Sequence, residues 1–196
     1  MALPKLRDCA TCEREFQPQR FGQKTCRLEC ALAHGRDTAH KKKIRAFSAE
    51  TAKRKSAIKT RSKWMKEAQV EFNKFIRTRD RHRPCVSCGT VEGDLNSHLT
   101  GGAFDCGHYL GTGSHPELRF FEFNAAKQCK KCNRQLSGNH GPYRVELIKR
   151  VGQSMVNFLE GPHEPCKYTI EDLQHIKVHF RDKAKLAQKA AEEQYE

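Results

Sequence analysis

The sequence reads DCGHYLGTGSHPELRFFEFNAAKQCKKCN over residues 105–133, and this stretch decides the fold. It begins with one histidine, His108, set among glycines, and ends on the Cys-x-x-Cys pair Cys129 and Cys132, followed directly by Asn133. A histidine in this setting is a loop residue, a zinc ligand or a catalytic base. The cysteines on either side are the first guide to which role it has.

A second Cys-x-x-Cys pair lies about forty residues before the first. Two such pairs supply the four thiolates of a tetrahedral zinc site. The predicted ligands of this site are Cys85, Cys88, Cys129 and Cys132. The insert between the pairs is too long for a simple zinc finger, so we expect it to hold structure of its own. His108 and Asn124 both lie inside this insert.

Another cysteine cluster precedes the basic part of the chain and predicts a second, separate zinc site. Its ligands are Cys9, Cys12, Cys26 and Cys30. Four thiolates leave no open position on the metal, so this site is expected to stabilise a small module rather than to catalyse. Free thiols are the alternative interpretation. Two cysteines, Cys106 and Cys166, are left over and are expected to be unliganded.

The composition favours small, metal-held units and a polyanionic partner. Of 196 residues only 37% are hydrophobic and 31% are charged, with a formal net charge of +14. Such a charge suits nucleic acid, although a soluble protein can be basic without binding it. No apolar run long enough for a membrane is present, and the N-terminus has no signal-peptide core. A cytoplasmic location is expected, where ten cysteines indicate metal rather than disulfides.

The chain divides into four predicted segments with an α+β fold class. They are an N-terminal four-cysteine zinc module at 1–36, a basic helical segment at 37–83, a zinc-braced core at 84–142 and a helical region at 143–196. In this interpretation basic helices join the small zinc-stabilised modules.

The basic segment has helical periodicity with two different faces. Its apolar face consists of Trp64, Ala68, Phe72, Phe75 and Ile76. Its opposite face, which we expect to contact DNA phosphates, consists of Lys63, Lys66, Lys74, Arg77 and Arg81. An ordinary solvated face is the alternative. Phosphate contacts of this kind give affinity and salt sensitivity but do not read the base sequence.

The C-terminal region also carries helical signals. Tyr143, Leu147 and Val151 have helical spacing. In YTIEDL, Thr169 is expected to be the N-cap of a helix, with Asp172 three residues on.

The arrangement around His108 resembles the HNH, or ββα-metal, endonucleases. That pattern runs from a cysteine pair to a histidine on a first strand, an asparagine in the turn, and a second cysteine pair entering a helix that carries a metal ligand. The resemblance implies that His108 is the general base and that Asn124 orients it or braces the loop. It also implies that Asp105 and Asn133 hold a catalytic Mg²⁺ or Mn²⁺, distinct from the zinc ions.

The chain departs from the usual pattern at two positions. The last position holds Asn133 in place of histidine, which some members of the superfamily permit. Gly107, rather than an acid or histidine, precedes His108, and the nearest acid is Asp105. On a regular strand residues 105 and 108 face opposite sides. A bulge permitted by glycine would bring them to one side. The fallback metal ligands are His98, His115 and His140.

The whole chain resembles the lambdoid phage NinG family, also called Rap recombination proteins. The resemblance rests on RDCATCEREFQPQRFGQKTCRLEC, FNKFIRTRDRHRPCVSCG, the stretch from residue 105 continued to LSGN, and YTIEDL. It implies a metal-dependent endonuclease that cleaves branched DNA, such as Holliday junctions and D-loops, in phage recombination in the host cytoplasm. A homodimer would suit paired cuts in a four-way junction. The alternatives are a non-catalytic, zinc-dependent DNA-binding accessory protein and an RNA-associated zinc protein.

Overall fold

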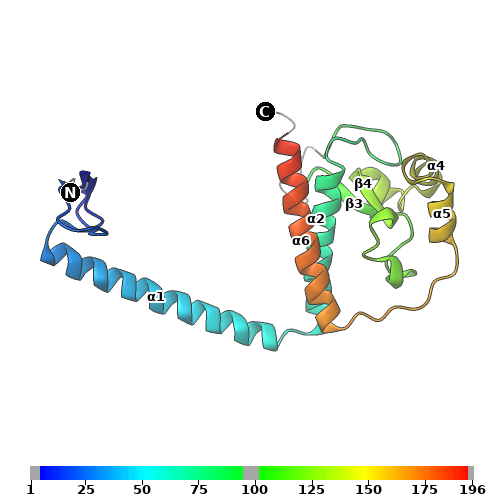
Figure 1. Ribbon diagram of the computed structural model, residues 1–196. Coiled ribbons are helices and arrows are strands. Elements are labelled where there is room, and N and C mark those ends of the chain that lie inside the picture. The colour runs from blue at the N-terminus through cyan, green and yellow to red at the C-terminus, as the bar shows by residue number, and fades with distance from the viewer. Residues whose placement is uncertain (1–4, 95–101, 194–196) are drawn as a thin grey trace. The chain divides into compact units, whose positions relative to one another are not determined.

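The computed structural model describes residues 5–94 and 102–193 (Figure 1). The chain forms two compact units, Met1–Lys59 and Thr60–Glu196. The boundary between them falls inside the predicted segment 37–83. The fold is mixed, with helices and two small antiparallel sheets, as the α+β prediction requires. Among the described residues no helix is both long and apolar enough to cross a membrane.

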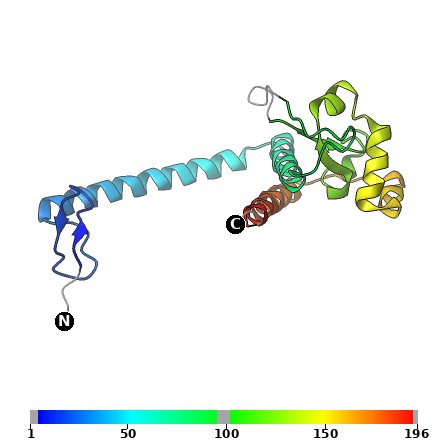
Figure 2. The same cartoon turned by 90° about the horizontal axis from the view of Figure 1, so that it is seen from above.

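The first unit is a short hairpin followed by one long helix. Strands β1 (Arg7–Asp8) and β2 (Glu15–Phe16) pair antiparallel, and the hairpin lies beside the start of helix α1 (Leu28–Ala57), drawn in blue in Figure 2. Only Cys30 of α1 is buried. The helix is therefore solvated almost all round, and its stability comes from local helix preference and i,i+4 ion pairs rather than from packing.

The second unit is organised around two helices that lie side by side, α2 (Arg61–Arg79) and α6 (Ile170–Glu192) (Figure 1). The buried residues of α2 are Trp64, Ala68, Phe72, Phe75 and Ile76, so the predicted apolar face is confirmed. Phe72 meets Phe180 of α6 edge to face, with ring centroids 4.8 Å apart. Such aromatic pairs add to the hydrophobic stabilisation of the core.

The start of α6 is fixed by its own sequence. The Thr169 side chain accepts a hydrogen bond from the Asp172 backbone N–H at 3.1 Å, and the Asp172 carboxylate accepts one from the Thr169 N–H at 2.8 Å. The predicted N-cap is confirmed as a complete capping box. This arrangement satisfies two backbone donors that a helix start would otherwise leave without partners.

A hairpin made of β3 (Asp105–His108) and β4 (Ala125–Gln128) packs on α2. The two strands pair without interruption, from Asp105 opposite Gln128 to His108 opposite Ala125. No bulge interrupts β3, so Asp105 and His108 are not brought to one side of the strand. Gly107 is needed for a different reason: a Cβ there would lie 2.1 Å from Oε1 of Gln128, so any larger residue would collide with that side chain.

The loop between the strands carries two short 3-10 helices, η1 (Pro116–Leu118) and η2 (Glu122–Asn124). A single π-helical turn, η3 (Lys131–Gln135), follows β4. Helices α4 (His140–Val151) and α5 (Gln153–Glu160) then cover the other side of the hairpin. Tyr143 and Leu147 of α4 are buried with Ala126 of β4 in a second core, as their helical spacing predicted.

Candidate metal centres and candidate active site

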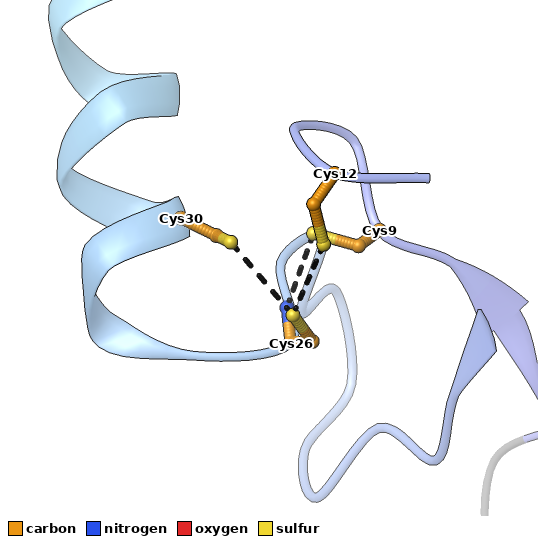
Figure 3. A group of neighbouring side chains, drawn as sticks. All are labelled: Cys9, Cys12, Cys26 and Cys30. Atoms are coloured by element: carbon orange, nitrogen blue, oxygen red, sulfur yellow. Dashed lines mark hydrogen bonds between the residues drawn. The ribbon is translucent and has the colours of Figure 1, made fainter. Parts of the chain in front are cut away.

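The first four-cysteine cluster lies where the β1–β2 hairpin meets α1 (Figure 3). Cys9 and Cys12 lie in the turn of the hairpin, and Cys30 lies in the first turn of α1. Cys26 stands between them, with its sulfur 3.6 Å from that of Cys12 and 3.8 Å from that of Cys30. All four sulfur atoms lie within 4.8 Å of one another, which suits a single tetrahedral zinc ion.

Backbone donors favour thiolate at Cys9, whereas burial and the neighbouring thiols raise the pKa of Cys26 to about 12. The Cys26 N–H points at the Cys9 sulfur at 3.4 Å. Burial raises the pKa of Cys9, but the N–H groups of Cys12, Thr11 and Cys26 outweigh it and lower that pKa to about 6. Thiolate is the form that binds metal, so the donor set fits zinc.

The second cluster joins the turn after α2 to the end of β4. Cys85, Cys129 and Cys132 are buried and Cys88 is exposed, and the sulfurs of Cys88 and Cys129 lie 3.7 Å apart. The Cys129 N–H donates to the Cys85 sulfur at 3.3 Å. This group and the first are the two sets of three or more His, Cys, Asp or Glu that the described residues bring close enough for one ion.

His108 is half-buried and held on two sides. Its ring stacks on Phe72 of α2, with centroids 5.6 Å apart and planes 26° apart. Its Nε2 lies 3.0 Å from the backbone oxygen of Arg119. A carbonyl only accepts, so Nε2 carries the hydrogen and Nδ1 keeps a lone pair. Burial lowers the pKa of His108 despite the Arg119 carbonyl, so the ring is neutral at pH 7 and can accept a proton.

Asn124 is fully buried, and its side chain braces the loop between the strands. Its Oδ1 accepts from the Leu110 N–H at 2.9 Å. Its Nδ2 donates to the backbone oxygens of Leu110 at 3.0 Å and Leu118 at 3.2 Å. These three hydrogen bonds fix the conformation of the loop that places the Arg119 carbonyl beside His108.

Asp105 and Asn133, the predicted ligands of a catalytic ion, are in direct contact. The Asn133 Nδ2 donates to the Asp105 carboxylate at 2.9 Å, and Arg134 binds both carboxylate oxygens at 2.7 and 2.8 Å. Burial raises the pKa of Asp105, but Arg134 and Asn133 outweigh it and hold that pKa below its usual value. With no bulge in β3, Asp105 faces η3 while His108 faces α2.

The fallback ligands do not gather at this point. His115 is paired with Glu117 through its Nδ1 at 3.2 Å, and His140 is exposed with its ring 6.1 Å from that of Tyr109. His98 lies outside the described residues. Cys106 packs against the α2–α6 core, where burial raises its pKa to about 12, and Cys166 is exposed.

Two arginines that the sequence analysis did not single out shape the site. The Arg119 guanidinium donates to Thr112 O at 2.9 Å and to the Gln69 side chain at 3.2 Å, which ties the loop to α2. Arg79 binds the carboxylate of the fully buried Asp80 at 2.8 Å through two nitrogens. The one available signal was the position of Asp80, an isolated acid in a basic run.

Arg79 also donates hydrogen bonds to the backbone on both sides of Asn124. It donates to Glu122 O at 3.0 Å and to Ala125 O at 2.8 Å. The Asp80 carboxylate in turn accepts from the Lys127 N–H at 3.1 Å. The end of α2 therefore fixes the position of β4 and of the loop brace.

The predicted DNA-binding residues flank this region on α2 and just beyond its end. Lys63, Lys66 and Lys74 are exposed, whereas Arg77 and Arg81 are half-buried. Gln69, which receives Arg119, lies on the same helix and donates to Asn73 at 2.8 Å. The lysines thus stand on the helix that supports the His108 ring.

The fold and these centres define a two-unit protein with two four-cysteine metal clusters and a histidine-bearing hairpin. The chain belongs to the NinG family: the family model described as Bacteriophage Lambda NinG protein matches residues 1–192. Protein ninG of Escherichia phage lambda is 39% identical over 201 residues, covering 94% of this chain and 95% of that protein. Protein ninG of Enterobacteria phage H19B is 41% identical over 203 residues, and that of Salmonella phage P22 is 38% identical over 201, each with the same coverage. No solved structure matches the chain.

Proposed function

We propose that the protein is a divalent-metal-dependent endonuclease that cleaves branched DNA, such as Holliday junctions and D-loops, during phage recombination. The observation that carries this proposal is the state of His108: Nε2 is committed to the Arg119 carbonyl, and burial lowers the ring pKa. A neutral imidazole with a free Nδ1 is what a general base needs near pH 7. The proposal includes a homodimer acting in the host cytoplasm.

In the proposed reaction a water molecule attacks the phosphorus of a phosphodiester. A bond forms between the water oxygen and phosphorus, and the water proton passes to Nδ1 of His108. The bond from phosphorus to the leaving oxygen breaks, and that oxygen takes a proton from solvent. Asn124 and Arg119 act as positioning residues, because they hold the loop whose carbonyl fixes the His108 ring.

Asp105 and Asn133 are the residues that would hold Mg²⁺ or Mn²⁺. Their oxygens are the hard donors these ions prefer, and such ions retain several waters. When bound, the ion would supply positive charge to the scissile phosphate and the leaving oxygen. Because Arg134 binds both oxygens of Asp105, ion binding requires that guanidinium to move.

Net charge and surface support DNA as the substrate. The formal net charge of +14 favours a polyanion. Lys63, Lys66 and Lys74 are exposed on α2, the helix on which His108 stacks. The lysines lie on the face of α2 opposite Phe72, so they would supply affinity for DNA rather than position a phosphate at the proposed base.

The test is cleavage of a labelled four-way junction beside a linear duplex of equal length, with EDTA, Mg²⁺ or Mn²⁺. We expect metal-dependent nicking of the junction that is lost in His108→Ala. His140→Ala is the matched control, because His140 is exposed and lies outside the proposed machinery. Nicking that survives His108→Ala would refute the role of His108.

A non-catalytic DNA-binding protein is the second candidate. The observation that favours it is the ion pair of Asp105 with Arg134, on the strand face away from His108. This candidate predicts tight junction binding with no cutting in any metal, and the same experiment separates the two functions.

A further inference from the structure

A cavity of about 150 Å³ opens between α4, β4 and the residues that precede β4. Leu147 and Val151 of α4 and the two alanines of β4 form an apolar wall. The rest of the lining consists of Phe123, Glu122 and three arginines, Arg79, Arg83 and Arg150. A cavity of this size admits a molecule of about one aromatic ring.

Two of these guanidinium groups, those of Arg83 and Arg150, have N–H groups that donate to no described residue. Arg150, whose side chain is only 9% exposed, bonds Glu146 at 3.0 Å and Pro84 O at 3.4 Å, but its Nη1 has no hydrogen-bond partner among the described residues. An unsatisfied buried donor is costly, so a site that leaves one is suited to an acceptor from outside. Arg83 is exposed. Its charge helps to lower the pKa of Asp80, but its guanidinium makes no hydrogen bond or ion pair at contact distance with a described residue.

The other charges around the cavity are already paired within the protein. Arg79 is used by Asp80 and two backbone carbonyls. Glu122 is paired with Lys183, and Glu146 with Arg150 and Lys149. The cavity therefore presents unused positive donors from Arg83 and Arg150 without a competing free carboxylate among the described residues that line it.

An exposed aromatic cluster adjoins the arginines. Phe123 is 45% exposed and meets Phe121 edge to face at 5.6 Å. Phe121 in turn contacts Phe158, itself 52% exposed, at 5.7 Å. Exposed aromatic rings beside cationic groups are the usual means by which proteins bind unpaired bases together with their phosphates.

We propose that this cavity binds one unpaired nucleotide of the DNA substrate, with its phosphate on Arg83 and Arg150 and its base against Phe123 and the apolar wall. An inorganic phosphate would leave that wall empty, and a base stacked inside a duplex cannot enter. This inference rests on the proposed function. Unstacked nucleotides occur where DNA arms meet, so a cavity that binds one would explain the proposed preference of the protein for branched DNA.

The position of the cavity fits this use. Ala125, which lines it, is the strand partner of His108. Facing residues of an antiparallel pair lie about 5 Å apart between Cα atoms. A nucleotide bound beside Ala125 would therefore lie about one strand spacing from His108, the proposed base.

The experiment uses the full zinc-loaded chain in EDTA, so that no cleavage is needed. The fluorescence of a single 2-aminopurine is followed on binding, with the probe either at the branch point of a four-way junction or inside one arm. We expect a change at the branch point only. Phe123→Ala and Arg83→Ala should abolish it and weaken junction binding about tenfold, with little effect on a linear duplex.

Two matched variants serve as controls. Phe47→Ala removes an exposed phenylalanine of α1, and Arg181→Ala removes an exposed arginine of α6. Both should behave as wild type. Unchanged fluorescence and junction affinity in Phe123→Ala and Arg83→Ala would overturn the proposal, as would an equal weakening on linear duplex. Because the readout is binding, it can succeed in a protein that proves unable to cut.

Discussion

The imidazole of His108 is held in one tautomer by the backbone carbonyl of Arg119, 3.0 Å from Nε2. The donor of this hydrogen bond is the ring of the proposed base, and the acceptor is a backbone carbonyl. No side-chain substitution can remove this acceptor directly. The geometry of the loop from Tyr109 to Asn124 is therefore what keeps Nδ1 available.

Cleavage should depend on pH through His108. Burial lowers its pKa below the usual 6.5. The neutral base is lost as pH falls through the folded-state pKa, so kcat/KM should be level at pH 7 and decline only below pH 6.5. A pH–rate profile on a labelled junction checks this. An acidic limb centred above 6.5 would show that the titrating group is not this histidine.

Asn124→Ala should destabilise the second unit by about 3 kcal/mol, because it leaves the buried backbone groups of Leu110 and Leu118 without partners. Urea unfolding measures the change. Asn157→Ala, at an exposed site on α5, should cost well under about 1 kcal/mol. Equal stability of the two variants would contradict the bracing role.

Asp80→Asn should cost about 3 kcal/mol, because it leaves the half-buried Arg79 without its counter-ion. Burial raises the pKa of Asp80, but Arg79 outweighs it and lowers that pKa below 3.8. The stabilisation is therefore present above pH 3.8 and is lost as pH falls through the lower folded-state pKa. The unfolding free energies of wild type and variant should begin to approach one another as pH falls below 3.8, whereas Asp182→Asn, at an exposed site, should match wild type throughout.

The chain should bind two zinc ions, one in each cysteine cluster. Cys26→Ser should reduce the stoichiometry to one while the second unit keeps its unfolding transition, since the clusters belong to different compact units. Native mass spectrometry counts the ions, and Cys166→Ser is the control. Two ions in Cys26→Ser would place the first zinc elsewhere.

Replacing Lys63, Lys66 and Lys74 together with Ala should weaken junction and duplex binding alike. Each DNA phosphate that the variant no longer neutralises should reduce the slope of log K against log salt by about 0.9. Titrations at several salt concentrations give this slope. Replacing Lys185 and Lys189 of α6, both exposed, is the comparison, and an equal weakening there would mean that charge alone matters.

What the sequence predicted correctly is local in character. The apolar face of α2 and the Thr169 cap follow from spacing within one helix, and both are confirmed. The cysteine clusters follow from paired spacing, and each brings four sulfurs together. The roles assigned to His108 and Asp105 remain predictions.

What the sequence did not predict depends on contacts between distant segments. The Arg119 carbonyl reaches His108 only because Asn124 closes the loop, and Arg79 reaches the loop from α2. The sequence suggests that Gly107 permits an unusual backbone conformation. In the structure a glycine is required there because the Gln128 side chain occupies the space of a Cβ. The spacing of residue types along the chain does not show which distant segments will lie in contact.

The pairing of α2 with α6 governs when this protein can fold. Residues 61–79 are synthesised well before residues 170–192, the helix that covers their apolar face. Until α6 has been made, Phe75 lacks its contact with Phe180 and Trp64 lacks its contact with Lys177. Exposed aromatic side chains favour aggregation, so a chain that stops before residue 170 should aggregate more readily than one that includes residues 170–192.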